Sequence, residues 1–278
     1  MRLLITGGSG YLGRHLVPLA VEKAGALVHT YYSNEPPGVP GERWLDIRDG
    51  DAVMALTSTF QPDVIIHAAG SSGRPAMSEV IERGAEHVTE AARRVGARLI
   101  HLSTDVVFDG KHAPYREADR PRPIHDYGRA KAQAEEIVAR HGDHVIVRTS
   151  LIYGLRQMDH GTTWLVDRLR KKEPVTLFVD QMRNPIWAIS LSKACLELAG
   201  HHYRGILHVA GRQMLSRAEF GVRMLDWWGV SERSTLSFGP GDGERWPADC
   251  TLDISRAQAL LETPLPGVDE VLGAHGID

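Results

Sequence analysis

Two side chains four residues apart, Tyr127 and Lys131, carry the clearest chemistry of the sequence. They stand where a long helix is predicted to begin, and this spacing brings both side chains to one helix face. A tyrosine hydroxyl ordinarily ionises near pH ~10, so it exchanges protons at neutral pH only if a nearby cation stabilises the phenolate. We expect the Lys131 ammonium to lower the pKa of Tyr127 in this way.

A glycine-rich turn follows the first apolar segment of the chain. Residues 2–6 are predicted to form a buried strand, and an apolar helical pattern begins beyond the turn. A dinucleotide diphosphate binds at such a junction, because glycines let the backbone approach the phosphates and the helix N-terminus offers free N–H groups. The residues of this turn that we predict to bind a cofactor are Gly7, Ser9, Gly10, Tyr11, Leu12, Gly13 and the adjoining Arg14.

The elements that must position these residues alternate between strand and helix. Strands are predicted at residues 2–6, 26–32, 43–46, 64–68, 98–102 and 144–148, and helices at 51–60, 77–95 and 125–141. This alternation is typical of an α/β protein of the Rossmann type, a doubly wound parallel sheet that binds ligands at the carboxyl ends of its strands. The glycine turn, residues 103–105 and the pair Thr149 and Ser150 fall at those ends.

The alternation loosens after residue 153. Helices are predicted around residues 162–171, 190–199 and 217–228, with short apolar segments at 175–178 and 206–209. We expect a dinucleotide-binding domain at 1–153 and a smaller C-terminal substrate-binding lobe at 154–278, with some of its segments returning to the sheet.

Composition excludes several other classes of protein. With 32 basic and 35 acidic residues the net charge is −3, so no global field favours nucleic acid or an anionic membrane. The two cysteines make no disulfide framework, and we find neither a signal-peptide pattern nor an apolar run near the ~20 residues that span a bilayer, so we expect a cytoplasmic protein. Fourteen histidines show no metal-ligand spacing, so no metal is expected.

Six blocks of sequence, in order, carry a family resemblance. They are TGGSGYLG at 6–13, LDIRD at 45–49, PDVIIHAA at 62–69, LSTDVVFDG at 102–110, YGRAKAQAE at 127–135 and VRTSLIYG at 147–154. Together they resemble the extended short-chain dehydrogenase/reductases that act on nucleotide sugars, and among these the dTDP-4-dehydrorhamnose reductase-like branch. Each block supplies the structural context that the others require.

The resemblance implies roles in carbonyl reduction, which needs a proton donor and stabilisation of the developing alkoxide. Tyr127 would donate the proton, Lys131 would also contact the nicotinamide ribose, and Thr104 would give the carbonyl oxygen a second donor. Ser103 is the rival for the role of Thr104 and is expected to contact the substrate. Asp105 either orients these hydroxyls or only forms a turn.

The cofactor is expected to be NADPH, with NADH as the alternative. No carboxylate stands at the tip of the second strand, where it would bind a ribose 2′-hydroxyl and repel a 2′-phosphate. Ser33 and Asn34 can instead donate hydrogen bonds to a phosphate and Arg14 can supply charge, whereas Glu35 is the objection. The resemblance places Asp46 and Ile47 at the adenine, and His67, Ala68 and Ala69 under the cofactor. The plainer alternative for His67 is that it ends a buried strand.

Two departures from the family pattern concern the substrate. Ile81 stands where related enzymes carry an asparagine, and Leu151 replaces a tryptophan that lies against the sugar in the reductases. Trp164 and Trp187 could cover the substrate, although tryptophan is more often a core residue. Arg183 is a candidate ligand for the substrate's diphosphate, because guanidinium groups bind phosphates bidentately.

The sequence therefore predicts an NAD(P)H-dependent reductase of a keto group, with the 4-keto group of a nucleotide-linked deoxysugar as the leading substrate. Two alternatives stay open. One is a non-catalytic NADP-binding subunit resembling the regulatory subunit of methionine adenosyltransferase. The other is a reductase or epimerase of the same fold with a different carbonyl substrate. A homodimer is left open as the oligomeric state.

Overall fold

The computed structural model describes residues 1–70 and 76–276 of the chain. Within these residues, seven parallel strands form the central sheet in the order β11-β6-β5-β4-β1-β2-β3. The strands are β1 (Arg2–Thr6), β2 (Ala26–Tyr31), β3 (Glu42–Trp44), β4 (Val64–His67), β5 (Arg98–Thr104), β6 (His144–Thr149) and β11 (Gly205–His208). The predicted α/β Rossmann-type sheet is confirmed.

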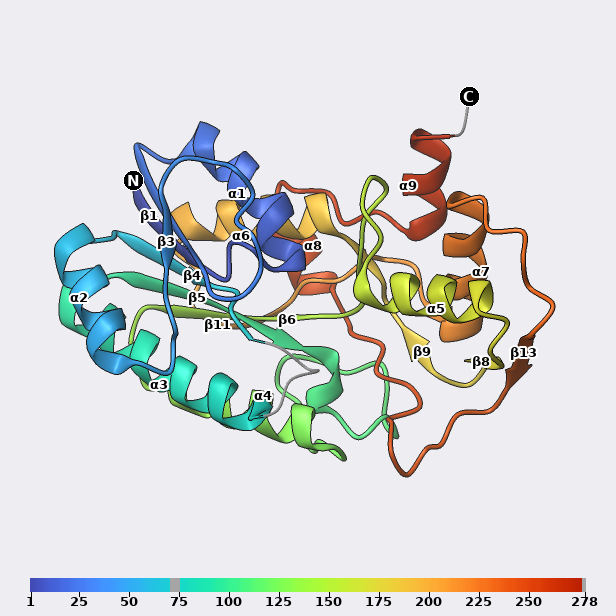
Figure 1. The fold of residues 1–278 in the computed structure, drawn as a ribbon. Coiled ribbons are helices and arrows are strands. Elements are labelled where there is room, and N and C mark those ends of the chain that lie inside the picture. Colours follow the sequence, from blue (N-terminus) through green and yellow to red (C-terminus); the bar gives the residue numbers. More distant parts are fainter. Residues whose placement is uncertain (71–75, 277–278) are drawn as a thin grey trace.

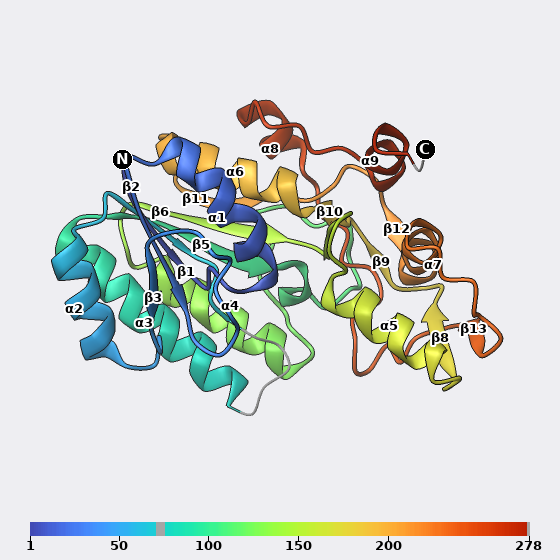
Figure 2. The ribbon, with the colours of Figure 1, turned by 45° about the horizontal axis from the view of Figure 1, so that its top comes forward.

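Helices cover both faces of the sheet, as Figures 1 and 2 show. On one face lie α1 (Tyr11–Lys23) and α6 (Ala188–Gly200), and on the other lie α2 (Gly50–Phe60), α3 (Met77–Val95) and α4 (Asp126–Val138). Successive strand residues serve opposite faces: Ile65 packs beneath α3, whereas Ile66 packs in the core beneath α1. Because both faces are buried, the inner strands are nearly continuous apolar runs.

The rest of the chain forms a smaller body beyond the carboxyl ends of the strands (Figure 1). Its elements include α5 (His160–Arg170), α7 (Arg217–Trp227) and α9 (Val268–Ala274), and three two-stranded pairs: β7 (Ile152–Tyr153) with β10 (Ile186–Trp187), β9 (Met182–Arg183) with β12 (Leu215–Ser216), and β8 (Val175–Phe178) with β13 (Leu236–Gly239). Leu165, Val175 and Leu225 belong to a separate apolar core in this body.

Two elements after residue 154 belong to the body of the central sheet: α6 packs on the sheet, and β11 is its edge strand beside β6. Helix α8 (Ser255–Leu260) lies beside β11. The C-terminal half of the chain therefore contributes to both bodies. The boundary between residues 153 and 154 stays a prediction.

Candidate active site

Tyr127 is the second residue of α4, and Lys131 follows one turn later. The helix lies close to the short helix η1 (Asp105–Val107) that follows β5, and Gly128 allows this approach. A methyl group at Gly128 would lie 2.3 Å from the Val106 carbonyl oxygen, where no side chain fits. The glycine thus brings Tyr127 to the carboxyl end of β5.

Lys131 is buried, and its Nζ donates a hydrogen bond to the Leu102 carbonyl oxygen at 2.6 Å. Nζ also lies 3.5 Å from His101 Nε2. Burial lowers the pKa of Lys131 to about 8, against a smaller upward effect of the Glu135 carboxylate. The ammonium is therefore held on β5, two residues before Thr104, and is easily deprotonated for a lysine.

The expectation that Lys131 lowers the pKa of Tyr127 is wrong for this structure. Burial, and secondarily the charge of Asp105, raise the pKa of Tyr127 to about 12. The ammonium of Lys131 is directed to a carbonyl oxygen of β5, whereas a carboxylate lies close enough to the phenol to disfavour its anion. Tyr127 is consequently protonated at neutral pH, which is the state of a proton donor.

Thr104 and Asp105 form a hydroxyl-carboxylate pair at the end of β5. Thr104 Oγ1 donates to Asp105 Oδ1 at 3.2 Å, and Ser150 Oγ donates to Asp105 Oδ2 at 2.6 Å. Asp105 is buried, and this burial raises the pKa of its carboxyl group, against the effect of the Arg183 guanidinium. Asp105 therefore orients the neighbouring hydroxyls, the first of its two sequence-based interpretations.

Ser103 and Arg183, the predicted substrate ligands, make hydrogen bonds within the protein. Ser103 is buried, and its hydroxyl donates at 2.5 Å to Glu135, which forms a buried ion pair with Arg148. Arg183 donates to the backbone carbonyls of residues 182, 247 and 248 and lies 3.6 Å from Asp105. Both side chains hold the protein together, although these hydrogen bonds use only three of the five N–H groups of Arg183. The roles of Ser103 and Arg183 as substrate ligands stay predictions.

The glycine turn between β1 and α1 is tightly built. Gly7 has a φ of +78°, and a methyl group there would lie 2.7 Å from the Ala69 backbone. A methyl group at Gly13 would lie 2.3 Å from the Gly7 carbonyl oxygen. These positions exclude side chains because β4, the turn and α1 touch through their backbones. Ala68 belongs to the same contact, since its N–H donates to the Thr6 carbonyl oxygen.

The first turn of α1 fits a diphosphate. Gly10 caps the helix without a side-chain hydrogen bond, and no side chain of residues 1–70 and 76–276 takes the first N–H groups, which belong to Tyr11, Leu12 and Gly13. The Tyr11 hydroxyl is turned away and donates to the Gln157 carbonyl oxygen at 2.9 Å, and Leu12 packs in the core. Ser9 is buried within the turn. These residues would therefore act through their backbone.

The edge of the sheet beyond β2 carries the predicted 2′-phosphate ligands. Ser33 and Asn34 are exposed, and Arg14 Nη2 donates to the Glu35 carbonyl oxygen at 2.7 Å. This bond holds the guanidinium against the loop that contains both residues. A cation and two polar side chains thus gather where the second strand ends.

Asp46 lies on the same edge, and Arg48 binds its carboxylate at distances of 2.6 to 3.1 Å. Hydrogen bonding by Arg48 lowers the pKa of Asp46. Arg48 also stands over the ring of Tyr32, which packs on Trp44. Ile47 is buried. The roles of Asp46 and Ile47 at the adenine stay predictions.

His67 ends β4 in a buried polar cluster. Its Nδ1 lies 2.6 Å from Thr6 Oγ1, and its ring lies 5.1 Å from that of His101. Burial and the charge of Lys131 lower the pKa of His67 to about 3, so the imidazole is neutral. This geometry fits the plainer alternative, a histidine that ends a buried strand.

The residues that depart from the family pattern lie in packed surroundings. Ile81 belongs to α3 and is buried in the core between this helix and the sheet. Leu151 packs against the cluster around Tyr153 and Phe220. Trp164 is exposed on α5 beneath the Arg168 guanidinium, and Trp187 packs on His275.

Sequence reasoning missed two aromatic residues beside Tyr127. His125, the N-cap of α4, lies almost parallel to the Tyr127 ring at 6.3 Å, and the Trp246 ring lies 4.6 Å from His125. Trp246 belongs to the turn-rich segment 239–247, far from Tyr127 in sequence. A tryptophan at the end of a polar, glycine-rich segment was the available signal in the sequence.

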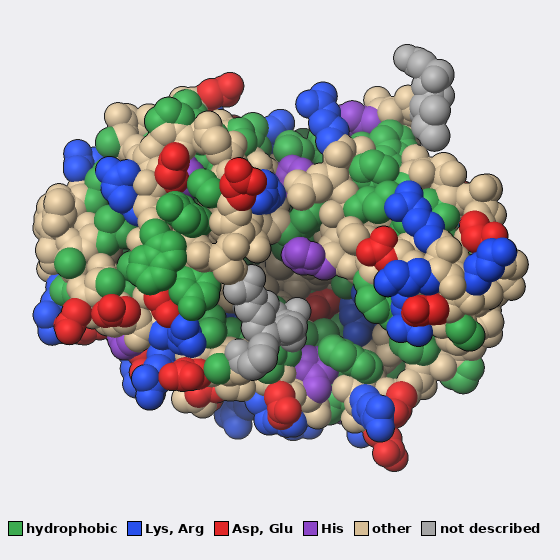
Figure 3. All heavy atoms as spheres, viewed as in Figure 1, with side chains coloured by type: hydrophobic (Ala, Val, Ile, Leu, Met, Phe, Trp, Pro, Cys, Tyr) green, Lys and Arg blue, Asp and Glu red, His purple; other side chains and the backbone are tan. Residues whose placement is uncertain are grey.

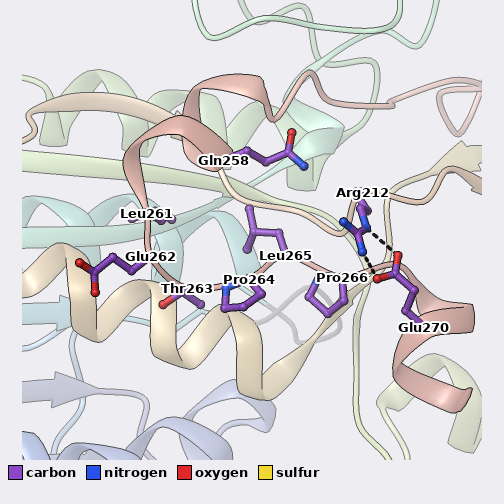
Figure 4. Close-up of a pocket in the computed structure, with 9 residues that line it drawn as sticks. All are labelled: Arg212, Gln258, Leu261, Glu262, Thr263, Pro264, Leu265, Pro266 and Glu270. Atoms are coloured by element: carbon purple, nitrogen blue, oxygen red, sulfur yellow. Dashed lines mark hydrogen bonds and ion pairs between the residues drawn. The ribbon is translucent and has the colours of Figure 1, made fainter. Parts of the chain in front are cut away.

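The molecular surface is hollowed between the two bodies, and acidic and basic side chains are visible inside the hollow (Figure 3). A second cavity, of about 360 Å³, lies apart from the predicted catalytic residues, and an ion pair between Arg212 and Glu270 borders it (Figure 4). None of the predicted site residues lines this second cavity. Across residues 1–70 and 76–276, no helix is long and apolar enough to cross a membrane, and no cluster of three or more potential metal ligands occurs.

A family model described as the RmlD substrate binding domain matches residues 1–273. The chain belongs to this family. Its length is thus almost wholly accounted for by one family, and the resemblance inferred from the six sequence blocks is confirmed.

Three relatives illustrate the range of the RmlD family. The dTDP-4-dehydrorhamnose reductase of Aggregatibacter actinomycetemcomitans is 31% identical over 81% of this chain and 78% of that protein. Methionine adenosyltransferase 2 subunit beta of Xenopus tropicalis is 30% identical over 93% of this chain and 82% of that protein. A crystal structure of a hypothetical dTDP-4-dehydrorhamnose reductase from Sulfolobus tokodaii has a TM-score of 0.83 at 30% identity and covers 97% of this chain and 98% of that one.

Proposed function

We propose that this protein is a reductase that uses NADPH to reduce the 4-keto group of a nucleotide-linked deoxysugar, with dTDP-4-dehydrorhamnose as the leading substrate. One observation carries the proposal. Tyr127 is held in its protonated state at the carboxyl end of β5, on the same helix as Lys131 and near the Thr104–Asp105 pair. The reductases among its relatives support the choice of substrate.

The residues of this chain divide the work of carbonyl reduction. The cofactor, when bound, would supply a hydride to the carbonyl carbon. Tyr127 donates its proton to the carbonyl oxygen, and the Thr104 hydroxyl donates a hydrogen bond to the same oxygen, so the alkoxide is stabilised as it forms. In the structure that hydroxyl donates its single proton to Asp105, so it must turn from Asp105 to the carbonyl oxygen when the substrate binds. The phenolate left on Tyr127 is reprotonated from water after the product is released.

The cofactor site runs along the carboxyl edge of the sheet. The first turn of α1 would bind the diphosphate, and Ala68 and Ala69 would lie beneath the cofactor. Arg14, Ser33 and Asn34 would bind the 2′-phosphate, which makes NADPH the preferred cofactor over NADH. Lys131 would contact the nicotinamide ribose. We assign the substrate to the body formed mainly by residues 154–278, which faces this edge.

A non-catalytic subunit is the second candidate, because methionine adenosyltransferase 2 subunit beta is as similar to this chain as the reductases are. The presence of Thr104, Tyr127 and Lys131 in one corner favours the reductase.

The decisive experiment follows NADPH absorbance at 340 nm with dTDP-4-dehydrorhamnose and other nucleotide-linked keto sugars. We expect one mole of NADPH oxidised per mole of sugar reduced, with a lower KM for NADPH than for NADH. Tight NADPH binding without turnover of any keto sugar would contradict the reductase and favour the regulatory subunit. Turnover with NADH as the better cofactor would contradict only the cofactor assignment.

A further inference from the structure

Three aromatic rings lie in a row at the catalytic corner, by which we mean Thr104, Asp105, Tyr127 and Lys131 at the carboxyl end of β5. Tyr127 and His125 are 6.3 Å apart with an angle of 23° between their planes, and His125 and Trp246 are 4.6 Å apart with an angle of 59°. Trp246 is 49% exposed, although it packs on His125. Part of a large aromatic surface is therefore left uncovered beside the residue that we assign as the proton donor.

The position of Trp246 is set by hydrogen bonds of the backbone on both sides of it in sequence. The Trp246 backbone N–H donates to the Asp242 carbonyl oxygen at 3.0 Å, and the Arg183 guanidinium donates to the Pro247 carbonyl oxygen at 2.9 Å. Arg183 itself lies 3.6 Å from Asp105. The exposed ring is thus tied to the catalytic corner by a buried arginine.

One ring nitrogen of His125 has a hydrogen-bond partner, and the other has none among the described residues. Its Nδ1 accepts a hydrogen bond from the Gly128 N–H at 2.9 Å, and a backbone N–H can only donate. Burial lowers the pKa of His125, so the ring is neutral at pH 7 and its proton resides on Nε2. Nε2 is buried and has no partner among the residues that the structure describes. A buried N–H without a partner is costly, and an acceptor on a ligand would relieve that cost.

We propose that Trp246 and His125 form the subsite for the sugar ring of the nucleotide-linked substrate. An apolar C–H face of the pyranose packs on Trp246, and a sugar hydroxyl accepts a hydrogen bond from His125 Nε2. Trp164 and Trp187 are engaged elsewhere, on Arg168 and His275. This inference rests on the proposed function, because it places the sugar next to Tyr127.

The test compares ligands that differ only by the sugar. Calorimetric titration of the NADP⁺-saturated protein with dTDP and with dTDP-rhamnose measures what the sugar adds to affinity. We expect Trp246→Ala to weaken dTDP-rhamnose binding by about tenfold and to leave dTDP binding unchanged, since aromatic stacking supplies an increment of this order. Trp246→Phe keeps a flat ring and should recover most of the loss. Trp164→Ala, at an exposed tryptophan on α5, is the matched control.

His125→Asn tests the second half of the subsite. Asparagine is a good N-cap, so α4 keeps an acceptor for its first turn while the ring and the Nε2 donor are lost. We expect an unchanged melting temperature, a raised KM for the keto sugar and an unchanged KM for NADPH. A similar KM for the keto sugar in the variant and the wild type would remove His125 from the subsite.

The outcomes separate this inference from the proposed function. If the wild type reduces the keto sugar but Trp246→Ala binds both ligands as the wild type does, only the subsite is wrong. An equal loss for dTDP and dTDP-rhamnose, or a sugar-specific loss in Trp164→Ala alone, would also overturn it. If the wild type neither reduces the keto sugar nor binds dTDP-rhamnose, the function and the subsite fall together.

Discussion

Ionisable groups are shifted in opposite directions in two regions of the molecule. One is the catalytic corner, and the other is the outer edge of the proposed cofactor site, where Asp46 and Arg48 lie. In the corner, burial is the largest influence on Asp105, Tyr127 and Lys131, and it shifts each pKa toward the neutral form. At the edge, Asp46 is partly exposed, and hydrogen bonding by Arg48 lowers its pKa, so its charge is stabilised. The corner therefore depends on packing from several elements, whereas the edge depends on local pairs in contact with water.

Because of this difference, we expect substitutions in the corner to have larger effects than substitutions at the edge. Removing a group from the corner leaves other buried groups without partners, whereas water replaces a group lost from the edge.

Tyr127→Phe removes the assigned proton donor and should have the largest effect. We expect kcat to fall about thousandfold, within the range that positioned acid catalysis contributes. NADPH affinity should stay the same because the ring is retained, as isothermal titration would show. If kcat fell by less than about tenfold, Tyr127 would not be the general acid.

Glu135→Gln removes the negative charge of the buried ion pair with Arg148, while its amide oxygen can still accept from the Ser103 hydroxyl. Leaving Arg148 buried without its counterion should cost about 3 kcal/mol of unfolding free energy, measured by urea denaturation. Arg93→Gln, in an exposed pair on α3, is the control and should leave the urea midpoint unchanged.

The pH profile of kcat/KM offers a second readout on the same variant. If the Lys131 ammonium is required, the rate should fall as pH rises through the Lys131 pKa of about 8. The Glu135 carboxylate raises that pKa, so Glu135→Gln should lower it and move the fall to lower pH. A profile that is flat to pH 10, or a shift to higher pH in the variant, would contradict the role of Lys131.

Gly128→Ala tests whether the close approach of α4 to η1 positions Tyr127. The added methyl group meets the Val106 carbonyl oxygen, so we expect a loss of about 2 kcal/mol of stability together with a lower kcat. Gly142→Ala is the matched control, because no atom lies within 4 Å of the added methyl group there. Equal behaviour of the two variants would show that the approach is not needed.

Arg14→Ala should have the smallest effect, confined to the cofactor. Loss of one partly buried charge near the 2′-phosphate should raise the KM for NADPH about tenfold and leave that for NADH unchanged. Initial rates with both cofactors measure this difference. Equal increases in KM for NADPH and NADH would show that Arg14 binds a part that the two cofactors share and not the 2′-phosphate.

Parts of the site could be predicted because they depend on neighbours in sequence. The glycine turn follows a short apolar strand, and the 127/131 pair lies four residues apart on a helix, so spacing alone places them. Ser103 could not be separated from Thr104 in this way. Adjacent residues of a strand point to opposite sides, and only the position of Glu135 shows which side receives Ser103.

The sequence by itself determined the fold class and the glycine turn, because apolar periodicity and local spacing set these, and its resemblance to the reductase family indicated the groups that could reduce a carbonyl. Tertiary structure alone decided that Tyr127 has a raised pKa, that Arg183 is occupied by backbone carbonyls, and that Trp246 meets His125. The physical reason is that a pKa depends on burial and on charges from other elements, and a contact between distant segments depends on how those elements pack.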